Sequence, residues 1–74
     1  MYTKTPSEAV EEALRKAGKK QQDLIEIVNV GTRQAANKKV KMNAWAAADL
    51  IAVTAATGGK LIFEMPNGEQ YELK

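Results

Sequence analysis

Apolar residues recur at helical spacing near the start of the chain. Intervals of three and four residues, the period of one helix face, relate Ala9, Val10, Ala13, Leu14 and Ala17. The preceding Thr5-Pro6-Ser7-Glu8 has the pattern of a capping box with proline in the first turn. Gly18 stands where a helix-terminating glycine is expected. The sequence therefore predicts a first helix over residues 6–17.

Three further segments have helical character. We expect helices over residues 21–28, 32–41 and 46–57. A turn should separate the first two, because Asn29 and Gly31 tolerate left-handed backbone angles. Thr32 is a suitable N-cap for the middle helix, whose apolar side is made of small residues such as Ala35 and Ala36. That helix must pack closely against a neighbour.

The end of the chain changes to strand-like alternation. Residues 60–65 and 69–73 alternate between apolar and polar around Pro66-Asn67-Gly68, a strong turn signal. A lone hairpin is marginal in water, so its apolar side chains must rest on the helices or on another chain. These side chains are Leu61, Phe63, Met65, Tyr71 and Leu73. The expected fold is mainly α, a single four-helix helix-turn-helix domain over residues 1–74 with a C-terminal β-hairpin.

Composition removes several classes of function. The 74 residues include no cysteine and no histidine, which excludes disulfides, zinc fingers and Cys or His nucleophiles. Asp23 and Glu26 lie on the predicted helix 21–28 and Asp49 on the predicted helix 46–57, and these acidic residues have plain structural uses there. We expect no enzyme activity, no metal, no cofactor and no small-molecule ligand. No apolar run could span a bilayer, and the N-terminus lacks the apolar region of a signal peptide, so we expect a cytoplasmic protein without a membrane partner.

Charge is distributed unevenly. Nine of the 11 basic residues lie between Ala13 and Lys60, a stretch with three acidic residues, whereas both ends of the chain are acidic. A basic middle indicates one positive face, as a polyanionic partner would require.

The predicted helices 21–28 and 32–41 carry the candidate chemistry. Two short helices joined by a turn, the second polar on its outer side, form the pattern of a helix-turn-helix. The outward side of the second helix holds Arg33, Gln34, Asn37, Lys38 and Lys41. Arginine pairs with guanine, and glutamine or asparagine pairs with adenine. Lys39 falls nearer the buried side, where its stem can lie along the core. Trp45, just before the last helix, fits a core or cap role.

Two stretches resemble a known family. Gly18-Lys19-Lys20-Gln21-Gln22-Asp23-Leu24 and Thr32-Arg33-Gln34-Ala35-Ala36-Asn37-Lys38-Lys39-Val40 are similar to the opening and the recognition helix of the phage Cro and repressor type (Xre-like) helix-turn-helix. The resemblance covers roughly residues 13–63. It implies that Gln21 contacts the DNA backbone and that Arg33, Gln34 and Asn37 read bases. The phosphate contacts expected beside them come from Lys19, Lys20, Gln21, Thr32, Lys38 and Lys41.

The chain also departs from that family. Ile25 stands where alanine is preferred, Asn29 where glycine is usual, Lys20 in place of an N-cap threonine and Ala46 in place of an N-cap serine. The turn over residues 29–32 is compatible with two registers of the following helix that differ by one residue.

Two functions follow from these features. The first is a sequence-specific transcriptional regulator that binds double-stranded DNA as a homodimer, with the hairpin as the candidate dimer element. The alternative is a small protein-interaction module, an inhibitor or adaptor of a host protein, on the same scaffold.

Overall fold

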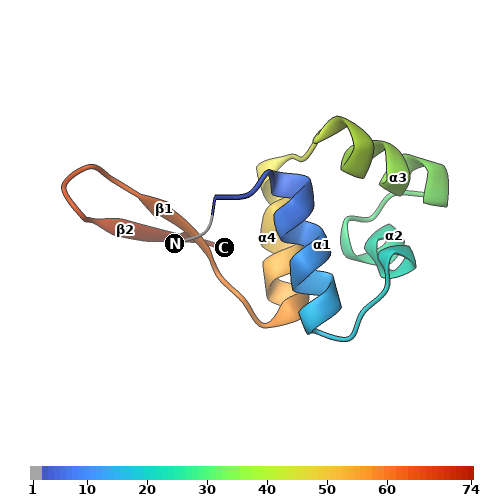
Figure 1. Ribbon diagram of the computed structural model, residues 1–74, viewed down its shortest axis with the longest axis horizontal. Helices are drawn as coiled ribbons and strands as arrows, with labels where there is room; N and C mark the ends of the chain where they lie inside the picture. The colour runs from blue at the N-terminus through green and yellow to red at the C-terminus, as the bar shows by residue number, and fades with distance from the viewer. Residues whose placement is uncertain (1–2) are drawn as a thin grey trace.

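The computed structural model describes residues 3–74. Within them, four α-helices are followed by an antiparallel two-stranded hairpin (Figure 1). The elements are α1 (Pro6–Lys16), the 3-10 helix η1 (Gln21–Asp23), α2 (Leu24–Ile27), α3 (Arg33–Met42), α4 (Ala47–Thr57), β1 (Leu61–Glu64) and β2 (Gln70–Leu73). The predicted fold class, mainly helical with a C-terminal hairpin, is confirmed.

Helix α1 begins and ends with the local motifs that its sequence predicts. The Glu8 N–H donates to Thr5 Oγ1 over 3.2 Å, and the Thr5 N–H donates to Glu8 Oε1 over 3.0 Å, which completes the capping box. At the other end Gly18 has φ +72°, and the Lys19 N–H donates to the Leu14 carbonyl over 2.8 Å, as in a Schellman motif. Ala17 is the C-cap, so the helix ends one residue before the predicted boundary.

The segment predicted as one helix over residues 21–28 has two parts. It starts as η1, continues as α2 and ends at Ile27, with Val28 as the C-cap. Lys20 offers no side-chain oxygen to the first-turn N–H groups, and the Asp23 N–H bonds the Lys20 carbonyl at 2.9 Å in the tighter 3-10 pattern. The Asp23 carboxylate in turn accepts from the Lys20 N–H over 2.8 Å.

The turn between α2 and α3 defines the register of α3. Asn29 has φ +53°, and the Val30 N–H donates to the Ile25 carbonyl over 3.1 Å, so asparagine takes the left-handed position that glycine usually fills. The Ala35 N–H donates to Thr32 Oγ1 over 3.1 Å. Thr32 is therefore the N-cap, and the two registers left open by the sequence reduce to one.

Helices α3 and α4 are each displaced slightly from their predicted bounds. Helix α3 runs from Arg33 to Met42, rather than over residues 32–41, and stops where Asn43 adopts φ +50°. Helix α4 begins at Ala47, one residue later than expected, because Ala46 is its extended N-cap.

Helices α1 and α4 pack side by side, with α2 and α3 beside them on the side away from the hairpin (Figure 1). The core lies among these four helices. Its buried apolar residues are Val10, Leu14, Leu24, Val28, Ala36 and Val53. Ala36 has only 2 % of its surface exposed, which confirms that the small-residue side of α3 is its packing side. None of the helices in residues 3–74 has the length and apolar character needed to cross a membrane.

The hairpin projects away from the helices (Figure 1). Its strands are slightly shorter than the predicted ranges 60–65 and 69–73, and they pair Phe63 with Tyr71 and Leu61 with Leu73. Phe63 and Tyr71 remain 57 % and 50 % exposed. Leu61, at the base, shares a cleft with residues of α1 and α4. Leu73 likewise lines a cleft with Ile51 and Thr54 of α4. The base of the apolar face therefore lies beside the helices, whereas Phe63 and Tyr71 farther out are left uncovered by them.

Candidate nucleic-acid interface

The outer side of α3 presents the residues that the helical pattern predicts. Arg33, Gln34, Lys38 and Lys41 are exposed and Asn37 is half-buried. A shallow groove along this side is lined by Gln34, Asn37, Lys38, Lys41 and Met42. The polar residues thus form one continuous strip on a helix whose opposite side is held in the core by Ala36.

A hydrogen bond connects this strip to the start of η1. Gln21 Nε2 donates to Asn37 Oδ1 over 3.1 Å, between two residues that are 16 positions apart in the chain. The structure therefore brings Gln21, the candidate backbone contact, beside Asn37, a candidate base reader. This contact was not predicted from the sequence.

The remaining candidate phosphate contacts lie around the same helix ends. Lys19 and Lys20 are exposed immediately before η1. Thr32 is exposed, and its hydroxyl oxygen already accepts the Ala35 N–H. Its O–H remains available as a donor, since a hydroxyl provides one donor besides its acceptor lone pairs.

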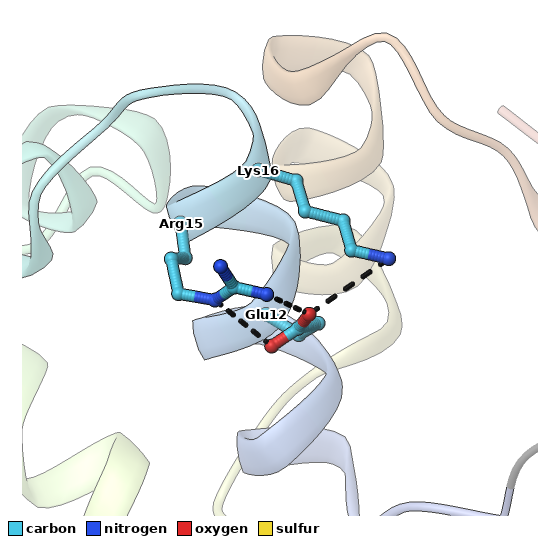
Figure 2. Close-up of polar contacts among 3 residues, drawn as sticks. All are labelled: Glu12, Arg15 and Lys16. Atoms are coloured by element: carbon cyan, nitrogen blue, oxygen red, sulfur yellow. Dashed lines mark hydrogen bonds and ion pairs between the residues drawn. The ribbon is translucent and has the colours of Figure 1, made fainter.

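Ion pairs divide the basic residues into two groups. Arg15 and Lys16 pair with Glu12 on α1, the lysine over 3.8 Å (Figure 2). The hydrogen bond from Arg15 lowers the pKa of Glu12 below its ordinary value. Lys60 and Lys74 both pair with Glu72 on the hairpin.

The other group surrounds α3. Within residues 3–74, no ion pair is formed by Lys19, Lys20, Arg33, Lys38 or Lys41. The cations on α1 and the hairpin are therefore paired with acidic residues, whereas those around η1 and on the outer side of α3 are not paired within residues 3–74.

Helix α3 is anchored from its inner side by an ion pair. Lys39 Nζ lies 2.8 Å from Asp49 Oδ2, with 24 % and 12 % of the two side chains exposed. Burial raises the pKa of Asp49, but the hydrogen bonds from Lys39 and from the Ala46 N–H outweigh it, and this pKa lies below its ordinary value. Asp49 also supplies the cap that Ala46 lacks, since it accepts the Ala46 N–H over 2.9 Å. The half-buried position expected for Lys39 is confirmed. Its ion-pair partner, Asp49, was not predicted from the sequence.

A polar cluster ties the end of α3 to the start of α1. Ser7 Oγ donates to the Val40 carbonyl over 2.6 Å and accepts from Trp45 Nε1 over 2.9 Å. The Ser7 N–H, one of the first-turn donors that a helix leaves free, donates to Asn43 Oδ1 over 2.8 Å. Trp45 also packs against the core, so the core or cap role expected for it is confirmed.

Sequence reasoning missed Ser7. It is only 7 % exposed, and it lies three and seven residues before Val10 and Leu14, the buried side chains of α1. This spacing places Ser7 on the inner side of the helix, and a polar residue in that phase is the signal that could have identified it.

The acidic residues have structural roles. Asp23 and Asp49 accept the N–H groups of the N-caps Lys20 and Ala46. In the part of the chain from residue 3 to residue 74, no group of three or more acidic, histidine or cysteine side chains is placed to hold a metal ion.

Comparison with protein-family models, with curated proteins and with solved structures finds no match to this chain.

Proposed function

We propose that this protein is a sequence-specific DNA-binding regulator that inserts α3 into the major groove. The observation that carries the proposal is the exposed polar strip of α3, flanked by cations that have no acidic partner within residues 3–74. A duplex offers matching chemistry, with base edges in the groove and phosphates on both sides of it.

Base reading is assigned to three residues of α3. The N-terminal part of a recognition helix contacts base edges, and Arg33 and Gln34 occupy the first turn of α3. Asn37 follows one turn later on the same groove as Gln34. Their fork-shaped and amide groups can each form paired hydrogen bonds with a base, arginine with guanine and the amides with adenine.

Phosphate contacts are assigned to the residues around these readers. Lys38 and Lys41 continue the strip beyond the base readers, whereas Lys19, Lys20 and Gln21 stand at the start of η1. Thr32 stands at the start of α3. Cations that neutralise phosphates release condensed counterions, so the affinity should fall steeply with salt. The proposal also implies a cytoplasmic protein, because its ligand would be intracellular DNA.

The alternative is a protein-interaction module that uses the same scaffold. The observation that favours DNA over a protein partner is the composition of the α3 strip. It holds one exposed large apolar residue, Met42 at 66 % exposure, among lysines and amides. The cores of protein interfaces are instead depleted in lysine.

A gel-shift titration against a pool of random duplexes at two salt concentrations tests the proposal. We expect a shift at low salt that weakens at high salt. The variant Lys38→Gln/Lys41→Gln should weaken the shift, whereas Lys16→Gln, which removes a cation paired with Glu12 on α1, should not. No shift at low salt would refute DNA binding and leave the protein-interaction module.

A further inference from the structure

The outer edge of strand β1 carries a sequence that is complementary to itself. We propose that two copies of this chain pair through this edge, antiparallel and with the two-fold axis at Ile62, to form a continuous four-stranded sheet. The partner is thus a second copy, and the surface is residues 60–64, Lys-Leu-Ile-Phe-Glu.

The hairpin has the properties of an unfinished sheet. Two strands alone are marginally stable in water, yet Phe63, Tyr71 and Leu73 on its apolar face are exposed. Ile62 is 42 % exposed on the opposite face, where its cross-strand partner is Glu72. Within residues 3–74, Ile62 therefore has no apolar residue opposite it on the neighbouring strand.

The pairing of the two strands determines which backbone groups remain free. The Met65 N–H donates to the Glu69 carbonyl over 2.8 Å. In an antiparallel ladder hydrogen-bonded pairs alternate with non-bonded pairs, so Phe63 and Leu61 also bond to β2. The N–H and C=O groups of Lys60, Ile62 and Glu64 consequently point to the outer edge, where a further strand can bond them.

A register centred on Ile62 uses these groups and matches every side chain. It places Ile62 opposite Ile62 of the second copy, in a hydrogen-bonded pair on the two-fold axis. Leu61 then faces Phe63 of the second copy, so apolar residues meet on one side of the sheet. Lys60 faces Glu64 of the second copy, and the symmetry repeats this opposite-charge pair on the other side of the axis. Apolar pairs and opposite charges directly across two strands both stabilise a sheet.

The other free edge fits a second copy less well. The groups of β2 that point outward belong to Gln70 and Glu72, by the same alternation. A two-fold axis at Glu72 places two carboxylates opposite each other, and like charges in that position are destabilising. An axis at the centre of β1 thus pairs opposite charges, whereas one at Glu72 of β2 pairs like charges, and this difference favours β1.

The same register gives the exposed phenylalanine a neighbour. Leu61 lines a cleft whose walls also include Val10 of α1 and Leu50 and Val53 of α4. Phe63 of the second copy lies opposite Leu61, at the strand position next to this cleft. The interface therefore joins the sheet edge to the apolar surface at the base of the hairpin.

Charge-reversal variants test the register directly, in the absence of DNA. Lys60→Glu should place two carboxylates opposite each other across the interface, and Glu64→Lys should place two ammonium groups there. Each variant alone should therefore be monomeric in sedimentation equilibrium. An equimolar mixture of the two should form a heterodimer, because the charges of one variant at positions 60 and 64 are then opposite to those of the other.

The mixture places opposite charges at every charged pair across the axis. Glu64→Lys supplies a lysine at both positions 60 and 64, and Lys60→Glu supplies a glutamate at both. The control variant Glu11→Lys makes the same change in charge as Glu64→Lys, but on the exposed side of α1. It should dimerise like the wild type.

The mixture also separates a lost interface from a misfolded hairpin. Lys60 pairs with Glu72 at 3.9 Å, and Glu64 accepts from Gln70 at 2.9 Å, so each variant alters a contact within the chain. Two misfolded variants could not recover by mixing. The proposal is overturned if the wild type stays monomeric, if either variant alone dimerises as the wild type does, or if the mixture stays monomeric. Because no DNA is present, these outcomes are independent of the proposed function.

Discussion

Gln21 Nε2 donates to Asn37 Oδ1 over 3.1 Å and joins the start of η1 to the middle of α3. A glutamine assigned to the DNA backbone thereby orients an asparagine assigned to a base. The Nδ2 group of Asn37 keeps both of its donors, since the bond uses only a lone pair of the carbonyl oxygen. The two residues should consequently act as a unit when the protein binds a duplex.

A double-mutant cycle measures that coupling. Gln21→Ala and Asn37→Ala should each weaken binding to a selected duplex, and the double variant should lose less than the two losses combined. The difference should be about 0.5–1.5 kcal/mol, the net value of one hydrogen bond. The exposed neighbour Gln22 supplies the control, because Gln22→Ala and Asn37→Ala should be additive. If the losses of binding free energy for Gln21→Ala and Asn37→Ala are additive, the two residues act independently and the proposed coupling is wrong.

Lys38 and Lys41 should contribute to affinity without regard to sequence. Each neutralised phosphate steepens the dependence of log K on log salt by about 0.9. Lys38→Gln and Lys41→Gln should each reduce the slope by about that amount and weaken all duplexes alike. Fluorescence anisotropy over a series of salt concentrations checks this, with Lys16→Gln as the variant whose slope stays unchanged. A slope that does not respond would remove both lysines from the interface.

Ser7 should matter for stability although it carries no charge. Ser7→Ala leaves the indole N–H of Trp45 without its acceptor and removes the donor to the Val40 carbonyl. The free energy of unfolding should fall by about 1–3 kcal/mol, the cost of a buried polar group left unpaired. Urea unfolding measures it. Glu11→Ala on the solvent side of α1 should change it by less than about 0.5 kcal/mol. Equal effects of the two variants would show that the cluster contributes nothing.

The features that the sequence predicts well are local ones. The capping box of α1 depends on Thr5 and Glu8, three residues apart, and the helix end depends on Gly18 alone. The alternation that predicts the hairpin is equally short in range. The outward strip of α3 follows from helical periodicity once Ala36 is recognised as the packing side. At Ala17, Thr32 and Ala46 the predicted helix boundary is wrong by one residue, because each of these residues is the cap of its helix and not its first or last residue.

The features that were missed join distant segments. The Trp45–Ser7 bond spans 38 positions, and the Gln21–Asn37 bond spans 16. The sequence around one residue of such a pair does not identify the other residue, because the contact depends on how the helices cross. The position of the hairpin was undetermined for the same reason. Its alternation shows that one side is apolar, but not which surface covers it.

Asp49 should make stability depend on pH. Its folded-state pKa is below the ordinary value of 3.8, so the carboxylate stabilises the fold above that pH and the contribution is lost as the pH falls through the folded-state pKa. Asp49→Asn should lower the free energy of unfolding by about 1–2 kcal/mol at about pH 7. The difference in unfolding free energy between this variant and the wild type, the gap, should narrow once the pH is well below 3.8. Urea unfolding at a series of pH values measures the gap, and a gap that stays constant would contradict the role given to the ionised group.

Selection of bound sequences from random duplexes tests the central claim most directly. The wild type should enrich a defined sequence, and the variant Arg33→Ala/Gln34→Ala should lose preference at the corresponding base pairs while still binding duplexes weakly through its lysines. Each lost base contact should cost about 1–3 kcal/mol. Enrichment of the same sequence by both proteins, or of none by the wild type, would contradict the assignment of base reading to α3.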